Sequence, residues 1–340
     1  MLFEDDPAPR LVGIARLAAA GELLEAKRRV EYLELETRRF IGRGSGRMRS
    51  IWTINPYRGC EFGCKYCYAR YAHEFMELRD PSLFENKIYA KRFEPGAFRD
   101  ELRRLKPGAT IWIGTATDPY QPAERRFRIT CRILEACAGE RRFDYGITTK
   151  SDLVARDAEL LSRIARGNSV AVHVSITTLD ERLARMIEPR APRPALRLAA
   201  VRKLSESGLP VCVLAHPVMP LINDSEKNLD QVCAAAAENG ASSFSAGPLF
   251  LKPCAQKVFF PFLAERFPHL ERRYRERFEK SAYLRGAYPE TIQERVRKIR
   301  DRHGLKAREA REWPVDDQLD LFGGTGPVPE STLQRKVDLL

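Results

Sequence analysis

The sequence predicts an α/β protein whose core is a parallel sheet. Between residue 51 and about residue 250, short runs rich in β-branched and aromatic residues alternate with segments of helical periodicity. This strand–helix alternation recurs six times, which is typical of parallel sheets. The 340 residues, 44% of them apolar, suffice for one barrel-sized domain, or two smaller ones, with a sizeable core.

The expected elements follow one another in a regular order. Strands are expected at residues 51–54, 110–113, 145–148, 170–176, 211–215 and 243–246. Helices are expected between them, near residues 97–105, 127–138, 152–165, 195–207 and 228–239. Six such units are fewer than the eight of a closed barrel, in which ligands gather at the carboxyl ends of the strands.

The N-terminal residues 1–50 form a separate segment. Apolar positions between residues 11 and 35 have helical spacing, and arginines then follow among glycines. We expect an N-terminal helix and a flexible basic arm that suits phosphates, or alternatively a solvated linker into the core. The arginines are Arg38, Arg39, Arg43, Arg47 and Arg49.

The pattern changes again after the predicted core domain, residues 51–257. We expect residues 258–312 to form helices that cap an open barrel, with arginines on their other face. Residues 313–340 are rich in proline and glycine and are expected to form a flexible tail. The apolar positions with helical spacing are Phe267, Leu270, Tyr274 and Phe278, and then Ile292, Val296 and Ile299.

Three cysteines, Cys60, Cys64 and Cys67, stand in Cys-x3-Cys-x2-Cys spacing just after the first expected strand. Thiolates bind iron–sulfur clusters or zinc. Three ligands would leave one iron of a four-iron cluster open to a substrate or cofactor, whereas a structural zinc site is normally closed by four protein ligands. No Cys-x2-Cys or His-x3-His pair lies downstream to close one.

The wider string NPYRGCEFGCKYCYAR, residues 55–70, resembles the radical S-adenosylmethionine (radical SAM) superfamily, and within it the branch named after spore photoproduct lyase. The alternative is a zinc loop or a chance set of cysteines. The resemblance implies a partial (β/α)6 barrel, a 4Fe–4S cluster on the three cysteines, S-adenosylmethionine on the open iron, and a cofactor contact from Tyr66. It also implies a 5′-deoxyadenosyl radical made by reductive cleavage, and an electron donor such as flavodoxin or ferredoxin.

A second element, GTATDPYQPAE at residues 114–124, directly follows the second expected strand. It resembles the element with which this branch binds the methionine amino group, which implies contacts from Gly114, Thr115, Thr117 and Asp118. Read alone, the string is a proline-rich turn.

Three more positions are candidate cofactor contacts at strand ends or in the following loops. Lys150 ends the third strand and suits the methionine carboxylate, or else is a surface lysine. Ser175 ends the fourth strand and suits a ribose contact, or else is a turn residue. Arg190 lies in EPRAPRPALR, residues 188–197, whose arginines suit the cofactor carboxylate or a substrate phosphate. The segment 216–224 resembles a branch element that lines the adenine.

The other cysteines are expected to be structural, apart from Cys254, which follows the sixth strand and could face the site. Spore photoproduct lyase uses a hydrogen-donor cysteine downstream of the cluster, but this chain has none between Cys67 and Cys131. The sequence therefore does not predict repair of the same thymine lesion by the same route. His173 is expected to be a packed residue. The core cysteines are Cys131, Cys137, Cys212 and Cys233.

The net charge of +12 favours a polyanionic partner, DNA above all, although an arginine-rich surface is the alternative explanation. The acidic start MLFEDDPAPR, the lack of any apolar run of about 18 residues, and eight cysteines without a disulfide pattern favour a cytoplasmic protein. We therefore expect a radical SAM enzyme acting on nucleic acid, in the manner of DNA repair. The alternatives are a protein or small-molecule substrate, or a structural metal-binding module.

The pentapeptide QLDLF in the tail resembles the motif by which bacterial replication and repair proteins dock on the DNA sliding clamp. A glutamine at a pocket rim and two large apolar residues in a cleft form a small anchor cluster. The alternative is that the motif folds back onto the barrel as a latch. Its residues are Gln318, Leu319, Asp320, Leu321 and Phe322.

Overall fold

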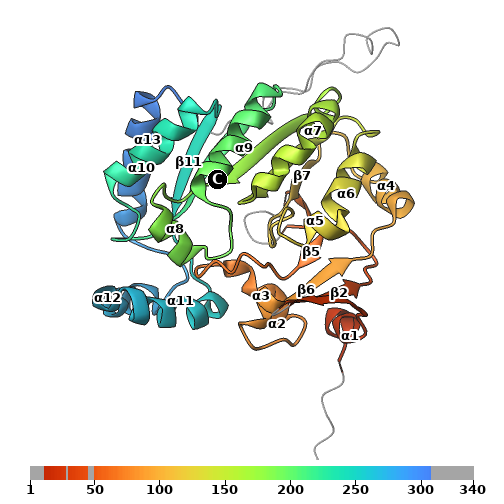
Figure 1. Ribbon diagram of the computed structural model, residues 1–340, viewed down its shortest axis with the longest axis horizontal. Coiled ribbons are helices and arrows are strands. Elements are labelled where there is room, and N and C mark those ends of the chain that lie inside the picture. The colour runs from red at the N-terminus through yellow and green to blue at the C-terminus, as the bar shows by residue number, and fades with distance from the viewer. Residues whose placement is uncertain (1–10, 28–29, 45–49, 308–340) are drawn as a thin grey trace, which may run out of the picture.

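The computed structural model describes residues 11–27, 30–44 and 50–307, and its main feature is a seven-stranded sheet (Figure 1). Six of the strands run parallel in chain order, each beside the next, and β3 (Ile41–Arg43) adds antiparallel at the edge. The partial (β/α)6 barrel expected from the sequence is therefore confirmed. The parallel strands are β4 (Trp52–Ile54), β7 (Thr110–Ile113), β8 (Asp144–Thr149), β9 (Ser169–Ser175), β10 (Val211–Val218) and β11 (Ser243–Pro248).

Helices cover the outer face of this sheet, as the strand–helix alternation predicts (Figure 1). One short helix, α8 (Glu181–Ile187), was not expected; the carboxylate of Asp180 caps it by accepting the amides of Arg182 and Leu183. The covering helices are α4 (Pro95–Arg103), α6 (Ile129–Cys137), α7 (Ala158–Ala165) with the preceding 3-10 turn η3 (Asp152–Asp157), α9 (Pro194–Glu206) and α10 (Glu226–Glu238).

The expected helix over residues 11–35 is wrong beyond Ala19. Helix α1 (Gly13–Ala19) is short, and β1 (Leu23–Lys27) and β2 (Val30–Leu35) follow it. They belong to a second sheet, ordered β1-β2-β6-β5, which also contains β5 (Tyr57–Arg58) and β6 (Lys87–Lys91).

The reason for this error lies in strand β2, which is buried on both faces. Val30 and Tyr32 face the main core, whereas Leu33 and Leu35 pack in a separate cluster with Tyr89. A strand covered on both faces does not alternate between apolar and polar residues, so its sequence resembles a helix.

Part of the expected flexible basic arm is also ordered. Arg43 lies in β3, and its guanidinium stacks over the Trp52 ring at 4.2 Å from the ring centroid. Arg47 and Arg49 fall outside the described residues.

The C-terminal helices lie in two different places. Helices α11 (Pro253–Arg266) and α12 (Pro268–Phe278) pack together and contact the cysteine loop, sharing an apolar cluster with Phe62 and Tyr66. Helix α13 (Tyr288–Arg302) instead packs against α10 and β11 and covers the last strand. Of these three helices, α11 and α12 therefore pack beside the cysteine loop, and the expected cap over the open barrel stays a prediction.

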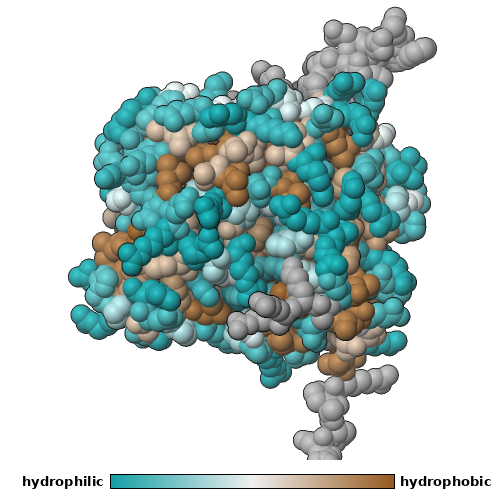
Figure 2. Space-filling view, in the orientation of Figure 1, coloured by the Kyte–Doolittle hydropathy of each residue, from teal (hydrophilic) through white to brown (hydrophobic). Residues whose placement is uncertain are grey.

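Hydrophilic residues cover most of the face seen in Figure 2, and hydrophobic residues reach it in scattered patches. Among the described residues, no helix combines the length and apolar character needed to cross a membrane.

Candidate active site

The loop after β4 carries Cys60, Cys64 and Cys67 at the carboxyl end of the parallel sheet. Its turns depend on glycine at two places. Gly59 has φ +77°, and a Cβ there would lie 2.7 Å from the carbonyl oxygen of Lys87; Gly63 has φ +64°, and a Cβ would lie 2.8 Å from the Glu85 carboxylate. A side chain at either position would clash with these oxygen atoms, so the tight turns of the cysteine loop require glycine.

Burial sets the protonation of the three thiols. It raises the pKa of Cys64 to about 12, and it raises the pKa of Cys67 as well. The pKa of Cys60 is raised first by burial and then by the charges of Asp118, Cys64 and Cys67, so the three sulfur atoms lie within electrostatic range of one another. Three neighbouring thiols that oppose one another's ionisation, two of them buried and Cys67 half-buried, fit a cationic group that replaces their protons on binding.

Across the described residues, no three His, Cys, Asp or Glu side chains are close enough together to hold one metal ion. A single zinc ion draws its thiolate ligands to about 2.3 Å from itself. A four-iron cluster bonds each thiolate to a different iron atom, so its ligands stand farther apart. Three cysteines in one loop, with Cys60 and Cys64 buried and Cys67 half-buried, form a donor set that fits a cluster with one iron left open.

The loop after β7, residues 114–124, is bound tightly to the cysteine loop. Asn55 accepts the amide of Ala116 at 2.8 Å and donates to the Thr115 hydroxyl at 3.1 Å. The Thr117 hydroxyl donates to the carbonyl oxygen of Tyr57 at 2.9 Å. The two motifs found in the sequence are therefore one structural unit.

Gln121 and Gly114 complete this unit. The Gln121 amide group accepts the amide of Glu61 and donates to the carbonyl oxygen of Gly59, both at 3.0 Å. Gly114 has φ +89°, and a Cβ there would lie 2.5 Å from the carbonyl oxygen of Thr148. The backbone thus approaches the next strand closely, as a glycine at this position predicts.

Asp118 joins this loop to the end of β8. Its two carboxylate oxygens accept the Thr149 hydroxyl and the Lys150 amide, each at 2.7 Å, and the Tyr120 amide at 2.9 Å. Burial raises the pKa of Asp118 even though these donors oppose the shift. Both carboxylate oxygens of Asp118 therefore accept hydrogen bonds that hold the chain around Lys150 in place.

Lys150 lies in a buried charged group near the cysteines. Its ammonium is 5.7 Å from the centroid of the Tyr66 ring. Burial opposes its charge, but Cys64, Glu188 and Asp118 raise its pKa above the usual value. The lysine is therefore a half-buried cation whose charge the neighbouring acidic groups stabilise.

Glu188 and Arg197 complete the charged group. The Arg197 guanidinium is 2.6 Å from the Glu188 carboxylate and donates to the carbonyl oxygen of Ser175 at 3.0 Å. Glu188 also accepts the hydroxyl of Tyr66. Burial opposes its ionisation, yet Arg197 and Lys150 hold its pKa below the usual value. One ion pair therefore links Tyr66 of the cysteine loop to the end of β9.

Arg190, the arginine expected to contact the cofactor, lies against the cysteine loop. Its guanidinium donates to the carbonyl oxygens of Glu61 at 3.4 Å and Glu85 at 3.3 Å, and it is 3.8 Å from the Glu85 carboxylate. It binds the cysteine loop without entering the group around Lys150. The segment 188–197 contains three arginines, and only the fold shows that Arg197 is the buried one.

Several other expectations can be placed. His173 is buried and stacks on Trp112, with ring centroids 4.9 Å apart, as expected for a packed residue. The Cys254 thiol donates to the carbonyl oxygen of Tyr68 at 3.5 Å, next to the cysteine loop. His216 lies 3.1 Å from the Ser245 hydroxyl in the neighbouring strand. Cys131, Cys137, Cys212 and Cys233 are buried, as expected.

Comparisons with known proteins agree with this arrangement. Residues 54–232 match the family model described as the radical SAM superfamily. The chain is 34% identical over 271 residues to the uncharacterized protein Rv2578c of Mycobacterium tuberculosis, covering 79% of each chain. It is 28% identical over 233 residues to the uncharacterized protein MJ0683 of Methanocaldococcus jannaschii, covering 67% of this chain and 78% of the relative.

Solved structures show the same fold at low sequence identity. The fold resembles that of a doubly substituted spore photoproduct lyase with bound AdoMet and dinucleoside spore photoproduct, with a TM-score of 0.59 and 14% identity. The match covers 88% of this chain and 85% of the lyase. A singly substituted form of the lyase matches with a TM-score of 0.58 and 14% identity, covering 80% and 79% of the two chains.

Proposed function

Because the chain belongs to the radical SAM superfamily, we propose that it is an enzyme that modifies nucleic acid at the site formed by the two interlocked loops. Its cofactors are those of the family, a 4Fe–4S cluster and S-adenosylmethionine. Together they supply the electron that cleaves the sulfonium and the 5′-deoxyadenosyl radical that abstracts hydrogen from a substrate. The observation that carries the proposal is the set of three cysteines in one loop, Cys60 and Cys64 buried and Cys67 half-buried, beside the half-buried Lys150.

The protein's own residues would bind and orient these groups. Cys60, Cys64 and Cys67 would hold the cluster. The Lys150 ammonium, kept charged by Glu188 and Asp118, suits the methionine carboxylate. The Arg197–Glu188 pair would fix the Tyr66 ring, which lies beside that lysine. Gly114 and Thr115 would contact the methionine amino group, a role supported by the resemblance of residues 114–124 to the element that binds it.

We propose nucleic acid as the substrate because of the net positive charge of the chain and the fold that it shares with the lyase. The chain carries a net charge of +12, which attracts polyanions. The similar lyase structure holds AdoMet and a dinucleoside spore photoproduct, which supports a substrate of this class for the shared fold. The alternative is a protein or small-molecule substrate, and the experiment must distinguish it from nucleic acid.

The test is salt-dependent binding by the anaerobically reconstituted protein. Fluorescently labelled DNA should bind at low salt, and the logarithm of the affinity should fall linearly as the logarithm of the salt concentration rises, because phosphate contacts release counterions. No DNA or RNA binding at low salt would contradict the nucleic-acid proposal while leaving the radical SAM chemistry standing.

We also propose that the tail docks on a bacterial sliding clamp through Gln318, Leu321 and Phe322. The motif lies outside the described residues, so the support comes from the sequence alone. An electron donor such as flavodoxin or ferredoxin is proposed on the same footing, from the family's chemistry.

A further inference from the structure

Five aromatic side chains form a continuous strip that begins at the cysteine loop. Tyr68, directly after Cys67, has its ring 6.4 Å from that of Tyr71, with the planes 25° apart, and 5.7 Å from that of Phe250. Phe250 stacks on Tyr283 with centroids 4.5 Å apart, and Phe75 packs edge-on against Tyr71 at 5.6 Å. We call these five residues the aromatic strip.

The aromatic strip is unusual in its exposure. Phe75 is 62% exposed, Tyr283 57% and Tyr68 38%. Within the described ranges, these three are the only aromatic side chains among the exposed large hydrophobic residues. An apolar ring gains free energy from burial, so three exposed rings in one contiguous surface mark a binding site rather than chance scatter.

The strip also joins the candidate active site directly. The hydroxyl of Tyr68 donates to the carbonyl oxygen of Thr115, in the loop expected to bind the methionine amino group. The carbonyl oxygen of Tyr68 accepts the Cys254 thiol at the start of α11. A ligand lying on the strip would therefore have one end next to the cysteine loop and the loop of residues 114–124.

A lysine supplies positive charge at the centre of the strip. The Lys252 ammonium is 4.1 Å from the centroid of the Tyr71 ring and 5.8 Å from that of Phe250. In the part of the chain that the structure describes, Lys252 forms no salt bridge, so its charge is available to a phosphate. Nearby Lys257 is paired with Glu74 at 3.3 Å and contributes less.

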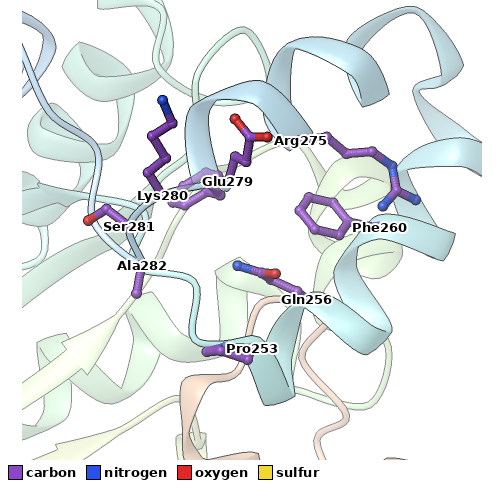
Figure 3. Close-up of a pocket in the computed structure, with 9 residues that line it drawn as sticks. Pro253, Gln256, Phe260, Arg275, Glu279, Lys280, Ser281 and Ala282 are labelled. Atoms are coloured by element: carbon purple, nitrogen blue, oxygen red, sulfur yellow. The ribbon is translucent and has the colours of Figure 1, made fainter.

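The strip continues into a groove of about 520 Å³ between α11, α12 and the following loop. Pro253 follows Lys252 in the chain, and Ala282 precedes Tyr283, so the groove begins where the strip ends. Figure 3 shows Phe260 and Gln256 projecting from α11, with Ser281 and Ala282 on the opposite side.

The groove carries charges of both signs. Arg275 lies over the Phe260 ring at 4.6 Å from its centroid and pairs with Glu271 at 2.8 Å. Lys280 and Glu279 are also among its lining residues. The Arg275 guanidinium lies over the Phe260 ring in the same way as the Lys252 ammonium lies over the Tyr71 ring.

We infer that the aromatic strip and this groove bind single-stranded nucleic acid, with bases stacked on Tyr68, Phe75 and Tyr283 and phosphates near Lys252. The inference rests on the proposed action on nucleic acid, and it specifies that the enzyme binds the single-stranded form. Aromatic side chains stack on bases of any sequence when the base faces are free, and basic groups follow the backbone. In a duplex the neighbouring base pairs cover those faces, so the rings favour unpaired or extruded bases.

The test is fluorescence anisotropy of a labelled oligothymidylate with the full-length, anaerobically reconstituted protein. Phe75→Ala and Tyr283→Ala should each weaken binding about tenfold, as expected for the loss of one stacked base. Lys252→Gln should weaken it and lower the salt slope by about one. These residues lie outside the cysteine loop, so iron content and basal cleavage of S-adenosylmethionine should not change.

Two matched controls lie elsewhere on the surface. Leu196, 49% exposed on α9, and Lys298, on α13, should tolerate Leu196→Ala and Lys298→Gln with no change in oligonucleotide affinity. A duplex of the same sequence should bind more weakly than the single strand and should respond less to the aromatic variants.

The outcomes separate the two proposals. If the wild-type protein binds neither single strands nor duplexes at low salt, action on nucleic acid is contradicted. If it binds them but Phe75→Ala and Tyr283→Ala retain full affinity, the inference about the strip alone is overturned, and a protein-docking role becomes the better explanation of the exposed rings.

Discussion

The Arg197 guanidinium lies 2.6 Å from a carboxylate oxygen of Glu188, and both side chains are almost completely excluded from solvent. The pair joins α9 to the loop that follows α8, and through the hydroxyl of Tyr66 it also fixes the cysteine loop. A buried pair of this kind is costly to break, because removing one partner leaves an uncompensated charge.

Arg197→Met should therefore lower the free energy of unfolding by about 3–5 kcal/mol, measured by anaerobic urea unfolding of the cluster-free protein. The double variant Glu188→Leu with Arg197→Met should recover much of that loss, because no buried charge remains. The control is Arg190→Met, whose partly exposed side chain should contribute less than about 1 kcal/mol. Equal losses for Arg190→Met and Arg197→Met would contradict this account.

Lys150→Ala should weaken binding of S-adenosylmethionine without loss of iron. The reason is that the lysine is held charged beside Cys64 and Glu188 but is not a metal ligand. Isothermal titration with S-adenosylmethionine and iron analysis of the same sample check both parts, and Lys298→Ala on the surface is the control. An unchanged affinity would remove Lys150 from the cofactor site.

Lys91 predicts a dependence of stability on pH. Burial and, to a smaller extent, the charge of Arg58 lower its pKa to about 7, while Glu101 opposes the shift. Between about pH 7 and pH 10 the unfolded chain then binds more protons at this lysine than the folded protein does, so its contribution makes the free energy of unfolding rise with pH.

The size of this slope is on the order of 1 kcal/mol per pH unit. Lys91→Met should remove it and should stabilise the protein below pH 7, where the buried ammonium is otherwise charged. Urea midpoints at a series of pH values provide the measurement. A variant that keeps the wild-type slope would show that Lys91 is not its source.

The tail should bind a bacterial sliding clamp weakly, at micromolar concentration. Leu321→Ala with Phe322→Ala should abolish binding, since these side chains would fill the apolar cleft. Surface plasmon resonance with the intact protein is the measurement, and an unchanged iron content shows that the barrel is intact. Equal binding by the double variant would reject the motif.

Most of the barrel could be predicted from the sequence because its strands are buried and regularly spaced. The run Thr110–Ile113 coincides with β7, and the other parallel strands differ from their expected bounds by one to three residues. The second sheet could not be predicted in this way. Its β6 includes two lysines, Lys87 and Lys91, and its β2 is apolar on both faces.

The candidate site also has one part that the sequence predicts and one part that it does not. A short motif in the sequence reveals Cys60, Cys64 and Cys67 because the three residues are close together in the chain and belong to one loop. The Glu188–Arg197 pair depends on how α9 packs, and the aromatic strip brings Tyr68 together with Phe250 and Tyr283, far away in the sequence. No local pattern encodes such contacts.

The most direct test of the central claim is anaerobic assay of iron content and 5′-deoxyadenosine formation in cysteine variants. Cys60→Ala, Cys64→Ala and Cys67→Ala should each lose the cluster and all cleavage of S-adenosylmethionine, whereas Cys131→Ala, Cys137→Ala and Cys233→Ala should keep both. Full iron content together with wild-type formation of 5′-deoxyadenosine in Cys64→Ala would contradict the assignment of this loop as the cluster site.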